Sequence, residues 1–224
     1  MKNLTNILST KTLSNDLLKK LDTCSFKTLS FDFISIQPIP FVKDEILNSS
    51  THWIITSKNT IKLLLTNYKP NELQHINFYC VGDKTAKIIV DNNLKLVTIA
   101  LSSAQLANKL VQNDAIKNYT FICGEMRRNE LERILKNRKI QLNEYIIYST
   151  TLSPNEIKQP LDGILFFSPS AIQSYLLKNS ITTETLFCIG NTTATEAKKY
   201  STNIIIADSQ TIESVVESVK KHYT

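Results

Sequence analysis

Short apolar runs alternate along almost the whole chain with segments in which apolar residues recur every three or four positions. The runs are four to six residues long, the usual length of a buried strand. They are Leu4–Ser9, Trp53–Thr56, Ile76–Val81, Lys95–Ile99, Tyr119–Cys123, Ile164–Phe167, Thr185–Ile189 and Asn203–Ala207. Two examples of the helical spacing are Ile61, Leu64, Leu65 and Tyr68, and Ile212, Val215, Val216 and Val219. The pattern predicts strands followed by helices in regular alternation.

The predicted helix starts carry residues that cap helices. Ser57, Asp83, Ser103 and Ser168 stand where a side-chain oxygen can accept a hydrogen bond from the exposed N–H groups of the first turn. Pro169 occupies a first helical position, where its missing N–H costs nothing. These signals place helix N-termini directly after the strands.

The chain also repeats itself. Ser57-Lys-Asn-Thr-Ile61 recurs 111 residues later as Ser168-Pro-Ser-Ala-Ile172, and Val81-Gly-Asp-Lys-Thr-Ala86 recurs 108 residues later as Ile189-Gly-Asn-Thr-Thr-Ala194. Two weaker matches, at offsets of 106 and 114 residues, keep the same order. A chain of 224 residues is long enough for two small domains. We therefore predict an α/β protein with two flavodoxin-like (Rossmann-like) parallel-sheet domains that face each other across a cleft.

Two extended segments break the alternation and occupy matching places in the two copies. They are Phe31–Pro40 and Gln141–Thr151. Two linker strands near 31–40 and 141–151, crossing between the domains, would explain them. Continuous strands of a domain core are the alternative, and the sequence leaves both open.

Composition and charge narrow the class of protein. A hydrophobic content of 42% and a charged content of 21% are globular values, which exclude disorder. The net charge of +6 admits nucleic acid, an anionic membrane or a polyanionic small molecule as partner. The chain lacks a block of like charges and any alternation of aromatic with basic residues. Both absences disfavour nucleic acid as the partner. Diffuse surface lysine and a polyanionic ligand both remain open.

The cysteines and the N-terminus indicate a cytoplasmic protein. Cys80, Cys123 and Cys188 lie in apolar runs, so buried strand cysteines explain them better than disulfides or metal ligands. No Cys-x-x-Cys pair occurs and the histidines are scattered, so we expect no metal site. No apolar run approaches the roughly 20 residues that cross a bilayer. Met1–Thr10 lacks the apolar core of a signal peptide.

Chemistry is expected at the turns after the strands, because ligands of parallel sheets bind beyond the carboxyl ends. These turns combine hydroxyls, glycines and cations: Thr10-Lys11, Ser57-Lys58-Asn59, Gly82-Asp-Lys84-Thr85, Gly124-Glu-Met-Arg127-Arg128, Ser168-Pro-Ser170 and Gly190-Asn-Thr192-Thr193. Helix capping or surface charge explains each residue taken singly. Their recurrence at every turn favours a set of anion receptors.

Several catalytic designs lack their markers. The chain has no Gly-x-Gly-x-x-Gly, no Walker-type loop, no Gly-x-Ser-x-Gly elbow and no acidic cluster for magnesium. What remains is a cofactor-free cleft rich in hydroxyls and cations. Such a cleft suits proton transfer and the shaping of a flexible anionic ligand.

A set of short motifs occurs in a specific order over nearly the whole length. They are Thr56-Ser-Lys-Asn59, Gly82-Asp-Lys-Thr-Ala86, Gly124 with Arg128 and Leu131, Tyr148-Ser-Thr150, Ser168-Pro-Ser-Ala171, Gly190-Asn-Thr-Thr-Ala194 and Thr211-Ile-Glu213. Together they resemble the uroporphyrinogen-III synthase family. The first strand departs from that pattern, because the family often has Thr-Arg-Pro where this chain has Thr10-Lys11-Thr12. Lysine keeps the charge but lacks the bidentate fork of arginine.

The resemblance implies a discontinuous first domain, 1–34 with 152–224, and a second domain, 38–148. It implies a monomeric, cofactor-independent lyase of haem or sirohaem synthesis, with neither nucleic acid nor membrane as partner. The substrate would be hydroxymethylbilane, a linear tetrapyrrole with an acetate and a propionate on each ring. Its cyclisation would lose water and invert ring D.

The resemblance also implies site residues. Tyr148 would assist departure of the substrate hydroxyl, with packing between the domains as the alternative role. The substrate-binding residues would be Thr10, Lys11, Ser57, Lys58, Lys84, Thr85, Gly124, Arg128, Ser168, Ser170, Thr192 and Thr193. The alternative for the whole chain is a non-catalytic two-domain intracellular binding protein for a small polyanionic metabolite.

Overall fold

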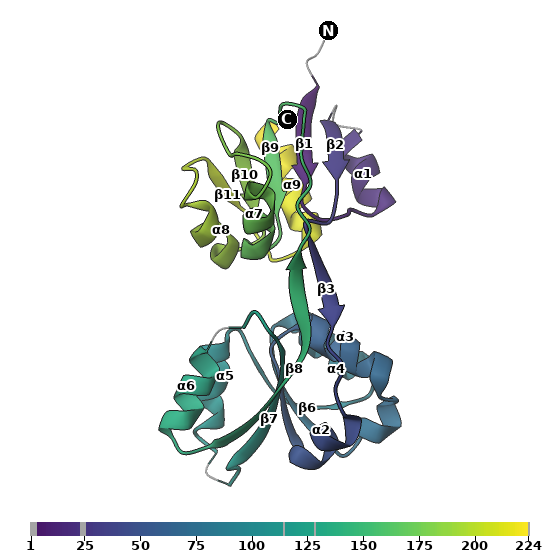
Figure 1. The fold of residues 1–224 in the computed structure, drawn as a ribbon, viewed down its shortest axis with the longest axis vertical. Helices are drawn as coiled ribbons and strands as arrows, with labels where there is room; N and C mark the ends of the chain where they lie inside the picture. The colour runs from purple at the N-terminus through teal and green to yellow at the C-terminus, as the bar shows by residue number, and fades with distance from the viewer. Residues whose placement is uncertain (1–3, 23–25, 114, 128, 224) are drawn as a thin grey trace. The chain divides into compact units, whose positions relative to one another are not determined.

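Two sheets flanked by helices account for most of the chain. The computed structural model describes residues 4–22, 26–113, 115–127 and 129–223. The chain divides into two compact units, and Figure 1 labels most of their helices and strands. Unit 1 is Met1–Ser35 with Thr151–Thr224, and unit 2 is Ile36–Thr150. The predicted α/β class is confirmed.

Unit 1 contains a five-stranded parallel sheet in the order β11-β10-β9-β1-β2. The strands are β1 (Thr5–Ser9), β2 (Phe26–Ser30), β9 (Gly163–Phe166), β10 (Thr185–Cys188) and β11 (Ile204–Ile206), and the helices are α1 (Asn15–Asp22), α7 (Pro169–Leu176), α8 (Asn191–Ala197) and α9 (Ile212–Tyr223). Neighbouring side chains of a strand point to opposite faces. Ile7 accordingly belongs to the core formed with α1 and α9, whereas Leu8 belongs to the core formed with α7 and α8.

Unit 2 contains a six-stranded sheet in the order β3-β8-β7-β4-β5-β6. The strands are β3 (Ile34–Pro38), β4 (His52–Ile55), β5 (Asn77–Val81), β6 (Lys95–Ala100), β7 (Asn118–Gly124) and β8 (Gln141–Leu152), and the helices are α2 (Lys43–Ser49), α3 (Lys58–Asn67), a 3-10 turn (Pro70–Leu73), α4 (Asp83–Asp91), α5 (Ser103–Leu110) and α6 (Glu130–Asn137). Ile55 packs in the core with α2, α3 and α4, and Ile54 in the core with α5 and α6. Both faces of the sheet are therefore covered.

Strands β3 and β8 cross the boundary between the units. The Ile39 N–H donates to the Ile147 carbonyl and the Ser153 N–H donates to the Phe33 carbonyl, both at 2.9 Å. Because one partner advances along the chain as the other recedes, the two segments run antiparallel. β8 also pairs in parallel with β7. β3 and β8 overlap the predicted linker segments 31–40 and 141–151, and β8 is at the same time a strand of the sheet of unit 2.

The eight predicted strands correspond to β1, β4, β5, β6, β7, β9, β10 and β11. The sequence did not predict β2, an edge strand of mixed polarity in which only Phe26 is buried. Lys27 of this strand is exposed, and Thr28, Leu29 and Ser30 are only partly buried, so the strand shows no apolar run. This is why the apolar pattern missed it.

Two of the predicted caps are wrong by one residue. Asp83 and Ser103 are the first helical residues of α4 and α5, and the caps are Gly82 and Ser102. The Ser102 hydroxyl accepts a hydrogen bond from the Gln105 N–H at 3.2 Å. Gly82 has φ = 82°, a conformation that side chains disfavour, so glycine takes the cap position there. The sequence signals locate a helix start only to within a residue.

Candidate active site

The carboxyl edge of the sheet in unit 2 carries five of the twelve predicted binding residues. Ser57 caps α3, where its hydroxyl accepts a hydrogen bond from the Asn59 N–H at 3.1 Å. Lys58 is the first residue of α3, and Lys84 and Thr85 lie in the first turn of α4. Both lysines are exposed, whereas Thr85 is buried.

A cavity of about 250 Å³ opens at this edge, within unit 2. We call it the Tyr148 cavity; its lining residues are Thr56, Ser57, Ser103, Phe121, Gly124, Met126, Arg127 and Tyr148. It brings together three predicted site residues, Ser57, Gly124 and Tyr148. Among the described residues, the lining includes neither of the lysines Lys58 and Lys84.

Tyr148 is held against Gly124 by a shift in strand register. Cys123 pairs with Ile146, but Gly124 pairs with Tyr148, so β8 has one extra residue at this point. The Glu125 N–H then donates to the Tyr148 carbonyl at 2.9 Å. A Cβ atom on residue 124 would overlap the tyrosine ring, so only glycine leaves room for the ring. The side chain of Tyr148, only 8% exposed, is thereby fixed at the wall of the cavity.

Arg127 contributes a guanidinium to the same cavity. Its Nη2 forms an ion pair with Glu144 of β8, and both side chains are only 22% exposed. Burial by itself lowers the pKa of Arg127, but the hydrogen bond to Glu144 and the nearby negative charges outweigh it, and the net pKa is raised. The guanidinium therefore stays charged at any physiological pH.

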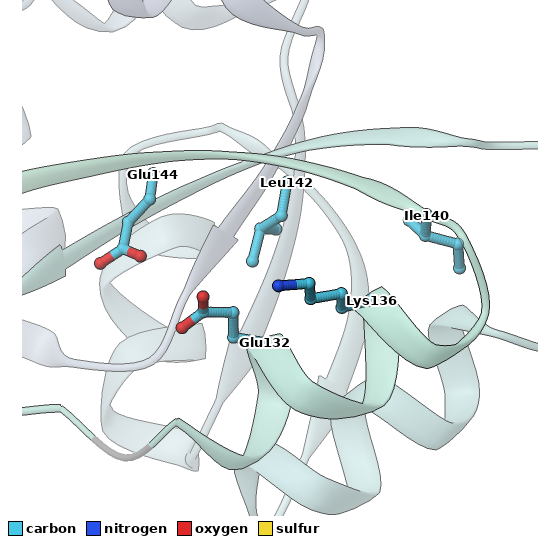
Figure 2. A pocket seen from close by; sticks show the side chains of 5 residues that line it. All are labelled: Glu132, Lys136, Ile140, Leu142 and Glu144. Atoms are coloured by element: carbon cyan, nitrogen blue, oxygen red, sulfur yellow. The ribbon is translucent and has the colours of Figure 1, made fainter.

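A second, smaller cavity adjoins Glu144. It measures about 150 Å³ and is lined by Glu132, Lys136, Ile140, Leu142 and Glu144. Figure 2 shows the side chains of Glu132 and Lys136, from α6, below those of Leu142 and Glu144 from β8. The Cys123 thiol points to the Glu144 carboxylate, at 3.5 Å from Oε1. Burial, followed by the charge of Glu144, raises the pKa of that thiol to about 12. Cys123 is therefore a protonated, unreactive thiol.

The carboxyl edge of the sheet in unit 1 carries six more of the predicted residues. Ser168 caps α7, accepting a hydrogen bond from the Ala171 N–H at 3.1 Å, and its hydroxyl lies 3.0 Å from that of Ser170. The Thr10 hydroxyl donates to the Leu165 carbonyl at 2.7 Å, which ties the end of β1 to β9. Lys11 is exposed, with its Nζ 3.8 Å from the Asp32 carboxylate.

Thr192 and Thr193 lie in the first turn of α8, where Thr192 is exposed and Thr193 is buried. In position and burial Thr193 therefore matches Thr85 of α4. Arg128 lies outside the described residues.

The predicted site residues omitted five residues that line the Tyr148 cavity, although Met126 and Arg127 stood in a predicted anion-receptor turn. Thr56, Ser103, Phe121, Met126 and Arg127 were not among the predicted site residues. A signal was present for four of them: Thr56 directly follows β4, Ser103 begins α5, and Met126 and Arg127 lie in the turn after β7. Phe121 lies inside β7 and carried no such signal. Arg127 stood in the same predicted turn as Arg128, and position alone did not favour one arginine over the other.

Two kinds of site find no support among the described residues. They include no group of three or more histidine, cysteine, aspartate or glutamate side chains arranged to hold a metal ion. Across the same described ranges, we find no helix with the length and apolar character needed to span a bilayer.

Comparison with known proteins gives one family. The sequence model described as uroporphyrinogen-III synthase HemD matches residues 16–217. A curated relative, the porphyrin biosynthesis protein HemD of Ruminiclostridium josui, is 25% identical over 242 residues, covering 96% of this chain and 48% of the relative. The chain thus spans about half the length of this curated relative.

Solved structures show the same fold. The uroporphyrinogen-III synthetase of Helicobacter pylori superposes with a TM-score of 0.71 at 20% identity, over 97% of this chain and 99% of the other. A mutant uroporphyrinogen III synthase of Thermus thermophilus gives a TM-score of 0.72 at 13% identity, over 97% of this chain and 98% of the other. At these identities the likeness establishes the fold.

Proposed function

The chain belongs to the uroporphyrinogen-III synthase family, and from this premise we propose that it cyclises hydroxymethylbilane to uroporphyrinogen III. The observation that carries the proposal is the match of the family's sequence model over residues 16–217. That span includes the candidate turns after β4, β5, β7, β9 and β10 and both linker strands. The curated relative acts in porphyrin biosynthesis, as its name states.

The proposed reaction is a dehydration followed by ring closure. The terminal hydroxyl of the bilane leaves as water, and the resulting azafulvene is an electrophile. The substituted carbon of the last pyrrole attacks it to give a spiro intermediate, which reopens and recloses with that ring inverted. The spontaneous reaction gives the symmetric isomer I, so the protein acts by selecting the conformation in which the unusual carbon attacks.

Tyr148 is the proposed proton donor to the departing hydroxyl, directly or through one water molecule. Its ring is fixed on Gly124, and its side chain lines a cavity that also presents the hydroxyls of Thr56 and Ser57. A positioned acid of this kind contributes roughly 10²–10⁴-fold to a rate. The water that leaves carries the donated proton, and the pyrrole proton released on closure restores the acid, so the reaction consumes no external reagent.

The remaining predicted residues are the proposed carboxylate receptors of this reaction. Each edge offers capping hydroxyls at helix N-termini, Ser57 in unit 2 and Ser168 in unit 1, where helix dipoles favour anions. The proposal includes a monomeric, cofactor-independent, cytoplasmic lyase. The buried free thiols of Cys80, Cys123 and Cys188 support a reducing compartment.

The product isomer tests the proposal. Freshly prepared hydroxymethylbilane is incubated with purified protein, and the oxidised products are separated by chromatography. We expect isomer III in excess, whereas heat-denatured protein gives isomer I. A product mixture identical to that of the denatured control would reject the proposed function. Tight binding of the bilane without a change of isomer would instead indicate a binding protein.

A further inference from the structure

Arg127 is the one charged side chain in the described lining of the Tyr148 cavity. The other polar groups there are the hydroxyls of Thr56, Ser57, Ser103 and Tyr148. No carboxylate belongs to the lining among the residues that the structure describes. The cavity therefore presents one full positive charge together with hydroxyl donors.

Two helices add to this positive character. Ser57 caps α3 and Ser103 is the first residue of α5, so both helices begin at the cavity. The N-terminal ends of helices carry partial positive charge and unsatisfied N–H groups. Their fields add to that of the guanidinium, and an anionic group is the ligand that this combination favours.

The guanidinium retains donors after its ion pair is formed. Arginine has five N–H groups in a fixed fork. Nη2 faces Glu144, and Nη1 donates to the Glu125 carbonyl in a long contact of 3.5 Å. Nε is buried and has no hydrogen-bond partner among the described residues. Glu144 thus fixes the orientation of the guanidinium without using all its donors.

The size of the cavity limits what enters it. Whole drug-sized ligands occupy pockets of roughly 300–1,000 Å³, whereas a water molecule takes about 30 Å³. The 250 Å³ of this cavity is too small for a tetrapyrrole but accommodates a carboxylate side arm with a few waters.

We propose that Arg127 binds one carboxylate side arm of the substrate in the Tyr148 cavity, beside the tyrosine hydroxyl. The proposal rests on the proposed function, since it takes the ligand to be a polycarboxylate tetrapyrrole. Binding there would hold one ring next to Tyr148 while its hydroxyl leaves. The competing explanation is that the Arg127–Glu144 pair only ties the β7 turn to β8.

The first experiment measures kinetics of the isomer-III reaction for Arg127→Gln, Arg127→Lys and Arg133→Gln. Arg133 is an exposed arginine of α6, so its replacement removes the same charge away from the cavity. We expect Arg127→Gln to raise KM about tenfold or more with kcat changed much less, because binding common to ground and transition states is lost. Arg127→Lys should recover part of that loss, because it keeps the charge without the fork. Arg133→Gln should stay within about twofold.

The second experiment makes failure of this inference distinguishable from failure of the proposed function. Uroporphyrin III, a stable oxidised tetrapyrrole with the same carboxylate side arms, is titrated into each variant and its fluorescence is followed. We expect Arg127→Gln to raise the Kd about tenfold relative to wild type and to Arg133→Gln, even if turnover is absent.

The contradicting results are specific. Equal KM and Kd values for wild type and Arg127→Gln would overturn the carboxylate role. If Arg127→Gln does not fold, Arg127→Met, which keeps the aliphatic stem and removes the charge, decides: KM and Kd both unchanged from wild type would overturn the role equally. A wild-type protein that neither turns over the bilane nor binds uroporphyrin would overturn both proposals.

Discussion

The contact between Gly124 and Tyr148 yields the sharpest structural prediction. Replacement of Gly124 by alanine places a Cβ atom where the ring of Tyr148 lies. The Tyr148 side chain is only 8% exposed and belongs to the buried core of unit 2, so moving the ring disturbs core packing even though one side of it faces the cavity. Gly124→Ala should therefore displace the ring and destabilise unit 2.

The size of the destabilisation by Gly124→Ala follows from two opposing contributions to the free energy of unfolding. Overpacking of a well-packed site costs about 1–3 kcal/mol. The backbone of Gly124 is not in the left-handed region, so alanine adds no conformational strain and instead gains about 0.4–1 kcal/mol from the unfolded chain. We expect a net loss of about 1–2 kcal/mol in the free energy of unfolding, as the balance of these two terms.

A double-mutant cycle isolates the contact. Urea unfolding is measured for wild type, Gly124→Ala, Tyr148→Leu and the double variant. Leucine lacks the ring atoms that the new Cβ would meet. In the Tyr148→Leu background, Gly124→Ala should be neutral or stabilising, which gives an interaction energy of at least about 1 kcal/mol.

Equal costs of Gly124→Ala in both backgrounds would refute the reasoning. Gly190→Ala is the matched control. Its backbone is extended at φ = 175°, and the added Cβ would lie 3.2 Å from the exposed side chain of Gln210, which can move aside. We expect that control to change stability by less than about 0.5 kcal/mol.

Three further predictions concern single side chains. Tyr148→Phe should lower kcat at least about tenfold at an unchanged urea midpoint, and unchanged turnover would return Tyr148 to a packing role. Ser168→Ala removes the cap of α7 and should lower the free energy of unfolding by about 1 kcal/mol; an unchanged midpoint would contradict this. Burial raises the pKa of Cys123 and Cys188 from 9.0 to about 12, so the folded state keeps thiol protons that the unfolded chain releases. The stability that these two thiols contribute should be complete below pH 9 and should be lost as the pH rises toward 12. The free energy of unfolding of Cys123→Ala/Cys188→Ala should therefore fall less steeply over this range than that of wild type, and an equally steep fall would contradict the prediction.

The fold was largely readable from the sequence because its central strands are buried on both faces. Runs such as Tyr119–Cys123 show no alternation of apolar and polar residues. The capping residues Ser57 and Ser168 mark where two such runs end and the next helices begin. β2 was missed because it is half-exposed at an edge. The predicted domain limits, 1–34 with 152–224 and 38–148, remain a prediction about regions that fold independently.

The candidate site was less readable because it depends on one irregularity. The extra residue in β8 opposite Gly124 sets Tyr148 against the turn, and nothing in the local pattern announces such a shift. The turn also contains two adjacent arginines. Which of them reaches the cavity depends on how the chain leaves β7, and the structure places Arg127 there, paired with Glu144.

The rate of isomer III formation tests the central claim most directly. With hydroxymethylbilane as sole substrate, the account predicts an initial rate of isomer III formation that rises in proportion to protein concentration and disappears after heat denaturation. Formation of isomer I alone, at a rate independent of protein concentration, would contradict the account.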